Sequence, residues 1–362
     1  MSRAESTFYV PGAEPSGPVG LRLRASDMRL QDGAHAALRA LGFRRVQGEP
    51  PDNPGPVSVR LSRREPSPSR PGGTSTVIAS DERGCLTRSD QGWEWTRPGY
   101  DLVVQSSADR AAAHFHEPTE GSLERRRVAY ALRHALTALF PRRDRYSIHA
   151  AGVFPREAPG GGLIAGPSGS GKSTLTAGLV DQGWGCLSDD HLALVPPETE
   201  AETAWVYGMT RGIRLRPDAW SRFNEADLEE PSTGTERPLY GGAGKRTYGP
   251  GWKADPAESA VPRWILFSEI TDRSESRLVR IGAAEALGQL LNQMHPPAAL
   301  PESAAAAQLD AAAALIRQSE CYHLSAGRDL HDDPGRLARL LPTGAGAPPS
   351  VEVNVPSGSG HK

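Results

Sequence analysis

A short segment at residues 166–174 constrains this chain more than any other feature. It reads Gly-Pro-Ser-Gly-Ser-Gly-Lys-Ser-Thr and satisfies the phosphate-binding pattern G-x-x-x-x-G-K-[ST] at every fixed position. An apolar run at residues 162–165 precedes it and an amphipathic run at residues 172–182 follows it, so we expect a strand, a loop and a helix in this order. A chance match in a glycine-rich chain would lack these neighbours. The pattern therefore predicts a P-loop that binds the phosphates of a nucleotide.

Each residue type in this loop has a physical reason. Glycines allow the backbone angles that turn successive N–H groups toward a phosphate at the positive end of a helix. We expect Lys172 to reach the β and γ phosphates of ATP, and the Ser173 hydroxyl to complete the oxygen shell of Mg²⁺. The residues predicted to bind the nucleotide are Gly166, Ser168, Gly169, Ser170, Gly171, Lys172, Ser173 and Thr174.

Two adjacent carboxylates, Asp189 and Asp190, follow the next apolar run at residues 185–188. Because one helix and one short turn separate this run from the P-loop, we expect its strand to lie beside the P-loop strand, with the carboxylates at the same sheet edge. There, one carboxylate can orient Mg²⁺ and the other can accept a proton from an attacking hydroxyl. A turn or helix cap built from Asp-Asp is the alternative interpretation.

His149 lies in the run at residues 147–154, just before the predicted P-loop strand. A single histidine on a short strand is more often a satisfied core or surface group than a functional one. Its position next to the P-loop favours a function. An imidazole beside the triphosphate could stabilise charge during transfer or help to position the acceptor.

The apolar pattern around these motifs divides the chain. Short, partly alternating runs before residue 121 predict strands, and residues 123–140 predict a helix with one apolar face. That face holds Val128, Leu132, Leu136 and Leu139. Further along, the pattern predicts a strand at residues 262–268 and helices at residues 283–294 and 303–318.

We therefore predict an α/β protein with a strand-rich N-terminal region. The expected parts are the N-terminal region at residues 1–122, a connecting helix at 123–145, a P-loop catalytic domain at 146–341 and a disordered tail at 342–362.

Composition narrows the class of protein. The chain has 41 basic and 43 acidic residues, a balance that argues against non-specific nucleic-acid binding. It contains no run of eighteen apolar residues, and the N-terminus lacks the order of a signal peptide. Its three cysteines are far apart, which excludes a disulfide framework. We expect a cytoplasmic protein without nucleic-acid or membrane partners, and a homo-oligomer stays open.

Three motifs occur in the order and near-spacing of HPr kinase/phosphorylase. They are Ser-Ile-His-Ala-Ala-Gly at residues 147–152, the P-loop, and Gly-Trp-Gly-Cys-Leu-Ser-Asp-Asp at residues 183–190. The chain resembles the C-terminal catalytic domain of that family over residues 146–196, and more weakly up to residue 341. The resemblance implies a P-loop kinase core related to phosphoenolpyruvate carboxykinase, with a serine of a protein or peptide as phosphate acceptor.

The resemblance also implies roles for single residues. Asp190 corresponds to the catalytic base, His149 and Lys172 to active-site residues, and Ser173 to a Mg²⁺ ligand. We predict Asp189 as a further metal-binding residue.

The chain also departs from the family pattern. The family's Glu-Ile-Arg-Gly strand has only a remnant at residues 209–213, with Thr210 where a Mg²⁺-binding glutamate would stand. Phosphorylase signatures are absent and the N-terminal region differs, so we expect neither a phosphorylase activity nor HPr as substrate. The pattern instead resembles the HPr-kinase-related proteins encoded with ribosomally made peptides, including lasso peptides, in which a kinase-like enzyme phosphorylates a precursor peptide.

We therefore expect an ATP- and Mg²⁺-dependent kinase that transfers the γ-phosphoryl group to a serine-type hydroxyl of a peptide or protein, such as a ribosomal-peptide precursor. An ATP-binding regulatory or scaffold protein without transfer, and a small-molecule kinase, are the alternatives. Arg211, Lys245 and Arg246 are candidate contacts for the acceptor or its phosphate. A solvated surface loop is the alternative for the last two.

Overall fold

The structure is a computed structural model of the chain. It describes residues 5–10, 19–25, 28–40, 44–46, 57–63, 76–81, 84–89, 92–97, 102–106, 110–115, 128, 132, 135–136, 139–156, 160–199, 202–209, 212–223, 228–229, 246–248, 259–294, 300 and 302–341.

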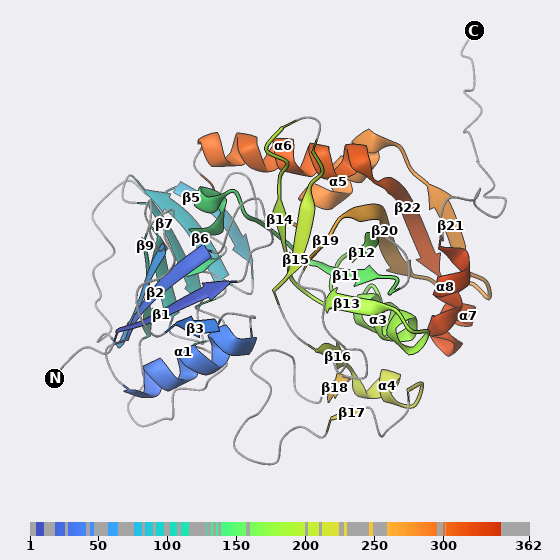
Figure 1. Cartoon of the computed structure of the whole chain (residues 1–362), viewed down its shortest axis with the longest axis horizontal. Coiled ribbons are helices and arrows are strands. Elements are labelled where there is room, and N and C mark those ends of the chain that lie inside the picture. Colours follow the sequence, from blue (N-terminus) through green and yellow to red (C-terminus); the bar gives the residue numbers. More distant parts are fainter. Residues whose placement is uncertain are drawn as a thin grey trace, which may run out of the picture.

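The N-terminal region forms one sheet of nine strands. The elements are β1 (Glu5–Val10), β2 (Val19–Ala25), α1 (Met28–Ala40), β3 (Arg44–Val46), β4 (Val57–Arg63), β5 (Thr76–Asp81), β6 (Gly84–Ser89), β7 (Gly92–Arg97), β8 (Leu102–Ser106) and β9 (Arg110–Phe115). The strand order is β3-β1-β2-β4-β9-β8-β7-β6-β5 (Figure 1). From β5 to β9 each strand pairs antiparallel with the next along the chain. The predicted strand-rich region is thus a single sheet.

Side-chain alternation explains how this sheet acquires a core. On β2, Leu21 and Leu23 are buried while Arg22 between them is half-buried, as expected for a strand with one covered face. On α1, Leu30, Ala34 and Leu38 recur at helical spacing and are fully buried, so this stripe faces the core. The sequence analysis did not predict α1.

The connecting helix is confirmed at the positions that the structure describes. Val128, Leu132, Leu136 and Leu139 are helical and buried, which is the apolar face predicted for residues 123–140. A short 3-10 helix, η1 (Phe140–Arg143), follows and leads into the second half of the chain.

A six-stranded sheet forms the centre of the second half. The elements in and around it are β11 (Ala150–Phe154), β12 (Gly161–Ala165), α3 (Lys172–Asp181), β13 (Gly185–Ser188), β20 (Pro262–Ile270), β21 (Arg277–Arg280), α5 (Ala283–Leu291), α6 (Glu302–Gln318), β22 (Glu320–Ala326), α7 (Arg328–Asp332), η5 (Pro334–Arg336) and α8 (Leu337–Leu340). The strand order is β13-β11-β12-β20-β22-β21. The pairs β12–β20 and β20–β22 are parallel.

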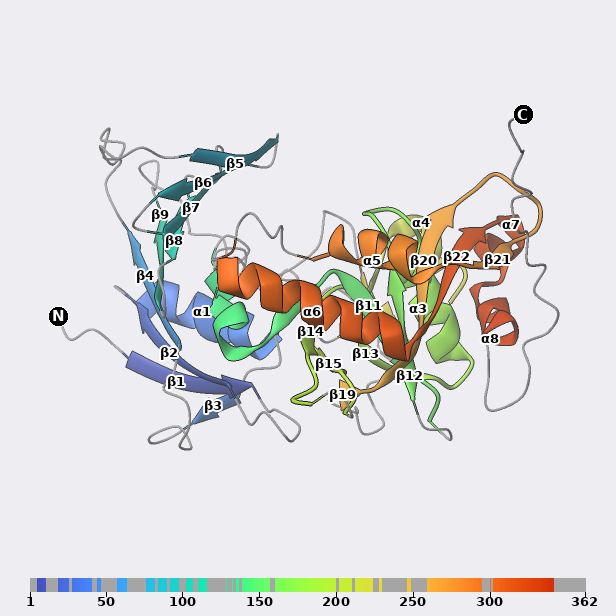
Figure 2. The same cartoon turned by 90° about the horizontal axis from the view of Figure 1, so that it is seen from above.

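Helices cover both faces of this sheet, as the apolar β12 requires. Leu163 of β12 packs in a core with Leu290 of α5 and Leu315 of α6. The next residue, Ile164, packs on the opposite face with Leu175 of α3 and Leu337 of α8. Figure 1 shows α5 and α6 above the strands and α3 below them, and Figure 2 shows the nine-stranded sheet at the other end of the molecule. This part is therefore a three-layer α/β fold.

Two smaller sheets flank the central one. One contains β10 (Tyr146–Ile148), β14 (Leu192–Val195), β15 (Trp205–Gly208) and β19 (Ser259–Ala260), in the order β10-β14-β15-β19. The other contains β16 (Ile213–Leu215), β17 (Leu228–Glu229) and β18 (Arg246–Tyr248), in the order β16-β18-β17, and the short helix α4 (Pro217–Trp220) follows β16. Among the described strands, none of these sheets pairs with the nine-stranded sheet.

The structure corrects two predictions. The strand β13 does not lie beside β12, because β11 pairs with both and separates them. The run at residues 147–154 is not one strand. It breaks at His149, where the chain leaves the four-stranded sheet and enters the six-stranded one. The predicted α/β class, the strand at residues 262–268 and the helices at 172–182, 283–294 and 303–318 are confirmed within a few residues.

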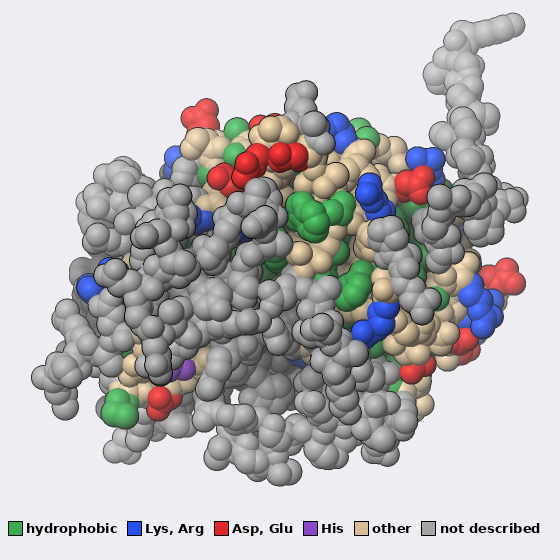
Figure 3. Space-filling model, viewed as in Figure 1, with side chains coloured by type: hydrophobic (Ala, Val, Ile, Leu, Met, Phe, Trp, Pro, Cys, Tyr) green, Lys and Arg blue, Asp and Glu red, His purple; other side chains and the backbone are tan. Residues whose placement is uncertain are grey.

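On the face seen in Figure 3, the described basic and acidic side chains are interspersed, in line with the net charge of −2. Of the helices that the structure describes, none combines the length and apolar character needed to cross a membrane. The predicted tail at residues 342–362 lies outside the described residues.

Candidate active site

The P-loop connects β12 to α3 and depends on glycine at three positions. Gly166, Gly169 and Gly171 have φ angles of 149°, 91° and 88°, values that other residues rarely adopt. At Gly166 there is also no room, since a Cβ atom would lie 2.6 Å from the Ser268 carbonyl oxygen of β20. Gly171 is the residue that caps the N-terminus of α3. The loop therefore ends at the positive end of a helix, as predicted.

Lys172 is buried within this loop, with 7% of its surface exposed. Its Nζ donates hydrogen bonds to the carbonyl oxygens of Gly166, at 2.6 Å, and Pro167, at 3.0 Å. The amine thus lies over the loop backbone. Ser170 is also buried, but its Oγ lies 3.2 Å from Ser268 Oγ, so this hydroxyl contacts β20.

A turn after β13 positions the carboxylate pair. The hydroxyl of Ser188, the last residue of β13, accepts hydrogen bonds from the backbone N–H groups of Asp190, at 3.4 Å, and His191, at 3.2 Å. The turn is therefore fixed by a side chain, as is common for serine. It directs Asp189 toward Ser173 and Asp190 toward two histidines, and Arg214 lies beside both carboxylates.

Asp189 is the inner carboxylate and is 2% exposed. Its Oδ2 accepts hydrogen bonds from Ser173 Oγ at 3.2 Å and from the Arg214 backbone N–H at 2.9 Å. Burial raises the pKa of Asp189, the positive charge of Arg214 opposes this, and the charge of Asp190 adds to the rise. Its Oδ1 is buried and accepts no hydrogen bond in the described part of the chain. A cation beside Asp189 would relieve the cost of burying its charge.

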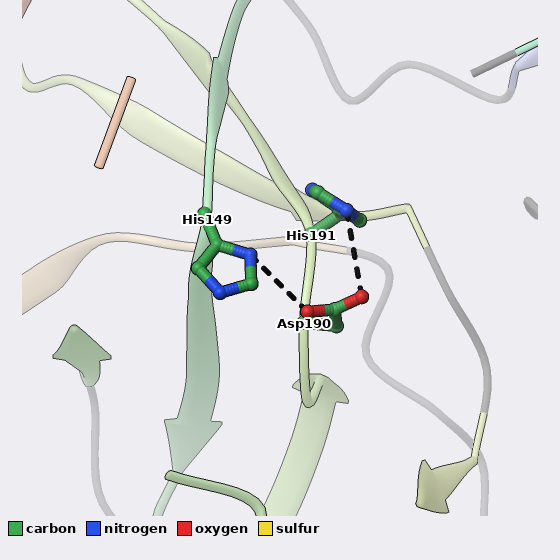
Figure 4. A group of neighbouring side chains, drawn as sticks. All are labelled: His149, Asp190 and His191. Atoms are coloured by element: carbon green, nitrogen blue, oxygen red, sulfur yellow. Dashed lines mark ion pairs between the residues drawn. The ribbon is translucent and has the colours of Figure 1, made fainter. Parts of the chain in front are cut away.

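Asp190 is the outer carboxylate and meets three potential cations. Its Oδ1 lies 3.2 Å from His149 Nδ1, and its Oδ2 lies 3.4 Å from His191 Nε2. Arg214 Nη2 donates a hydrogen bond to the same Oδ2 at 2.9 Å. Figure 4 shows the two histidines on either side of the carboxylate, each facing one of its oxygens.

The break between β10 and β11 brings His149 to Asp190. The backbone N–H of His149 donates to the Gln293 carbonyl at 2.7 Å, which holds the break against the end of α5. The rings of His149 and His191 lie edge to face, with centroids 5.4 Å apart. His149 therefore reaches Asp190 from the segment between β10 and β11, whereas the Asp pair itself follows β13.

Lys172, both carboxylates and His149 line one cleft of about 160 Å³. The lining residues are His149, Ser168, Gly169, Gly171, Lys172, Ser173, Thr174, Asp189, Asp190, Arg214, Leu215, Arg216, Asp218, Ala219 and Ile270. The P-loop thus shares a cleft with the carboxylate pair and with β16.

Most of the predicted site residues meet in this cleft. Of the predicted phosphate-binding residues, Gly166 and Ser170 do not line it. Arg211 and Lys245 lie outside the described residues, and of Arg246 only the backbone, in β18, is described. Whether these three contact an acceptor or its phosphate stays a prediction.

Two partners of Asp190, His191 and Arg214, were not among the predicted site residues. His191 had a signal, because it directly follows the Asp pair, but its contact with Asp190 depends on the turn at Ser188. On a strand, Arg214 shares one face with Arg216, an arrangement that suits either an acidic partner or water. The structure gives it both carboxylates, with Nη2 3.7 Å from Asp189 Oδ1 and 2.9 Å from Asp190 Oδ2.

Magnesium fits the inner part of the cleft. Mg²⁺ prefers oxygen ligands and usually takes only one or two carboxylates from a protein. Ser173 Oγ and Asp189 supply such oxygens within hydrogen-bonding distance of each other, and Asp189 Oδ1 is buried without a hydrogen bond from a described residue. These are the residues that could hold the ion.

The chain matches no model of a known protein family, and no curated protein matches it significantly.

Proposed function

We propose that the chain is an ATP- and Mg²⁺-dependent kinase that transfers the γ-phosphoryl group to a serine-type hydroxyl of a peptide or protein. A ribosomal-peptide precursor is the acceptor we favour. The proposal includes a P-loop kinase core of the HPr kinase and phosphoenolpyruvate carboxykinase type for residues 146–341.

One observation carries the proposal. A P-loop with its buried Lys172 shares a cleft with two carboxylates: Asp189, which accepts a hydrogen bond from Ser173, and Asp190, which faces His149 and Arg214. A protein that only binds ATP needs the loop and a metal-binding carboxylate such as Asp189. A second carboxylate, oriented by its own partners, is what a transfer reaction requires in addition.

In the proposed reaction each residue has one task. Lys172 binds the β and γ phosphates of ATP. Asp190 takes the proton of the acceptor hydroxyl, whose oxygen forms a new bond to the γ phosphorus while the bond from that phosphorus to the β–γ bridging oxygen breaks, and ADP leaves. Arg214 holds Asp190 in place and puts a positive charge beside the transferred group. Mg²⁺, held by Ser173 and Asp189, would neutralise phosphate charge.

His149 is assigned a positioning task in this reaction. Its Nδ1 faces Asp190 Oδ1, whereas Arg214 Nη2 donates to Oδ2. A hydrogen bond there fixes the rotation of the carboxylate. Its removal should lower the rate of transfer more than the affinity for ATP.

The test is a transfer assay with the full chain. The protein is incubated with Mg²⁺, γ-labelled ATP and a library of serine-containing peptides, and a matched library carries alanine in place of serine. Label on the serine library alone supports the proposal. Label that stays on nucleotide or phosphate favours an ATP-binding scaffold, and label on a metabolite hydroxyl in a cell extract freed of peptides favours a small-molecule kinase.

Asp190→Asn is the control variant, because the amide keeps the size of the carboxylate but does not accept a proton. Transfer that continues at the wild-type rate in this variant would overturn the proposed mechanism. Absence of ATP binding by the wild-type protein would overturn the proposed function altogether.

A further inference from the structure

We propose that His149, Asp190 and His191 form a binding site for a divalent transition-metal ion of the Zn²⁺ type, separate from the Mg²⁺ site at Ser173 and Asp189. This site goes beyond the proposed function, because a phosphoryl transfer with Asp190 as base does not require it. It is also independent of that function, since ion binding can be measured without nucleotide or acceptor.

The geometry of the three side chains carries the proposal. One potential ligand atom from each lies within 4.8 Å of the other two. His149 Nδ1 is 3.2 Å from Asp190 Oδ1, and His191 Nε2 is 3.4 Å from Asp190 Oδ2. In a tetrahedral site with bonds of about 2.0–2.1 Å, neighbouring ligand atoms lie about 3.3–3.4 Å apart. Both distances are close to that spacing but run to different oxygens of Asp190, so an ion bound to Oδ1 would require a rotation of the His191 side chain toward it.

The chemistry of the donors selects the class of ion. Imidazole nitrogen suits Zn²⁺, Cu²⁺, Fe²⁺ and Ni²⁺, whereas Mg²⁺ requires oxygen ligands. Two imidazoles and one carboxylate make a set that Zn²⁺ accepts. Three protein ligands leave at least one position for water or another oxygen ligand. His149 and Asp190 line the cleft, so this position is reached from there.

The backbone holds the donors independently of any ion. The Gln293 carbonyl accepts the His149 N–H, and the Ser188 hydroxyl accepts the N–H groups of Asp190 and His191. The His191 carbonyl in turn accepts the N–H of Met209 at 3.0 Å. A site whose ligands are already positioned loses less conformational entropy when it binds an ion.

Arg214 determines which oxygen of Asp190 would bind. Its Nη2 donates to Oδ2 at 2.9 Å, which stabilises the charged carboxylate and directs the ion to Oδ1. An oxygen bound to an ion does not take up a proton. Zn²⁺ and the proton of an acceptor hydroxyl therefore compete for Asp190 Oδ1.

The test is a titration of the full chain after removal of metals by a chelator. Zn²⁺ is titrated calorimetrically and Co²⁺ by visible absorption, both in millimolar Mg²⁺ and without nucleotide. We expect one equivalent to bind, with an intense tetrahedral Co²⁺ spectrum. His149→Gln and His191→Gln should each weaken binding by about 100-fold or more, because each removes a direct ligand.

His323→Gln is the matched control. His323 Nε2 lies 3.0 Å from Glu269 Oε1, but this pair has no third potential ligand among the described residues. Zn²⁺ affinity should be unchanged in this variant. Circular dichroism of each variant shows whether it folds.

Three results would overturn the proposal. The first is that the wild-type protein binds no equivalent of Zn²⁺ at micromolar concentration. The second is that the wild type and folded His191→Gln bind Zn²⁺ with equal affinity. The third is that His323→Gln loses as much Zn²⁺ affinity as the site variants do. The wild-type titration decides by itself if both site variants fail to fold. Transfer is measured on the Zn²⁺-free chain with Mg²⁺ alone, because Zn²⁺ on Asp190 would itself block the base. A chain that binds Zn²⁺ but transfers no phosphate in this Zn²⁺-free form would keep the site and reject the proposed function, and the reverse result would do the opposite.

Discussion

The two large sheets of this protein are assembled from the chain in different ways. In the nine-stranded sheet, β5 to β9 follow one another in sequence and in space, each paired antiparallel with the next. In the six-stranded sheet, β12 pairs in parallel with β20, and β20 with β22, although long stretches of chain separate them. Local hairpins suffice for β5 to β9, whereas β4 joins the same sheet by parallel pairs with β2 and β9. In the six-stranded sheet the pairs at long range lie at the centre, on either side of β20.

This difference determines where chemical groups can gather. Parallel neighbours end at the same sheet edge, so the P-loop after β12 lies against Ser268 near the end of β20. The turn after β13 and the break before β11 bring Asp190 and His149 to the same place. Each of these segments comes from a different part of the chain. The comparison therefore predicts that ATP binding and transfer depend on the second half.

The largest expected effect separates the two regions directly. Lys172→Ala removes the buried amine of the P-loop and should abolish transfer, with ATP affinity lower by roughly 10- to 100-fold for a lost charge-assisted contact. Arg60→Ala removes an exposed cation from β4 of the nine-stranded sheet and should leave both unchanged. Calorimetric titration with Mg-ATP and the peptide assay measure the two effects. Equal losses in the two variants would remove the proposed distinction between the regions.

The second prediction separates the two carboxylates. Asp190→Asn should keep Mg-ATP affinity and lose about 10²–10⁴ in transfer rate, because the amide does not accept a proton. Asp189→Asn should instead raise the Mg²⁺ concentration needed for half-maximal activity, because the ion loses a charged ligand. Rates measured over a range of Mg²⁺ concentrations distinguish the two. The assignment of roles is wrong if both variants give the same profile.

A third prediction concerns the N-terminal region itself. A chain that begins at Leu123 lacks all nine strands of the first sheet, which form no described strand pair with the other sheets. We expect it to stay soluble and to bind ATP within about twofold of the full chain, because the residues that line the cleft all belong to the second half. A factor of two corresponds to about 0.4 kcal/mol of binding free energy. We propose that the N-terminal region presents the acceptor, so the shorter chain should lose transfer to the peptide.

Aggregation of this shorter chain would mean that the two regions share one core. Transfer at the full rate would instead reject the role of the N-terminal region in presenting the acceptor. Size-exclusion chromatography and the peptide assay decide between these results.

A smaller effect tests how tightly the helices on the two faces of the six-stranded sheet are packed. Gly178 lies inside α3, and a Cβ atom there would come within 2.5 Å of the backbone carbon of Pro334 in η5. Gly178→Ala should therefore lower the free energy of unfolding by about 1–3 kcal/mol, although alanine is the better helix residue. Gly288→Ala in α5 has nothing within 4 Å and should raise it by about 0.5–1 kcal/mol. Urea unfolding of both variants checks the opposite signs.

The smallest predicted effect is the pH dependence of Asp189. Burial raises its pKa above the usual 3.8, so the folded protein keeps a proton that the unfolded chain has already released. This contribution to stability is complete below pH 3.8 and is lost as the pH rises through the folded pKa. Asp189→Asn removes the dependence and keeps an oxygen for Ser173 and Arg214.

At pH 7, Asp189→Asn should therefore be more stable than the wild type by roughly 1 kcal/mol without nucleotide. The difference should shrink toward pH 4. Urea unfolding of both proteins across this range measures it, and a difference that grows toward low pH would contradict the expected sign.

The sequence by itself determined the local elements and the groups they carry. The P-loop, its flanking β12 and α3, the Asp pair after β13 and the apolar face of the connecting helix follow from residue type and spacing within short segments. Such features depend on neighbours in the chain, which a sequence displays directly. The cleft residues Lys172, Ser173 and Asp190 were predicted for that reason.

Only the tertiary structure decided how these elements lie against each other. It placed β11 between β13 and β12, broke the predicted strand at His149, and brought Arg214 of β16 and the unpredicted His191 to Asp190. Strand order depends on burying both faces of a sheet under helices that lie far apart in the sequence. The apolar periodicity of a single strand does not specify which other strand will be its neighbour. The partners of Asp190 are therefore set by long-range packing.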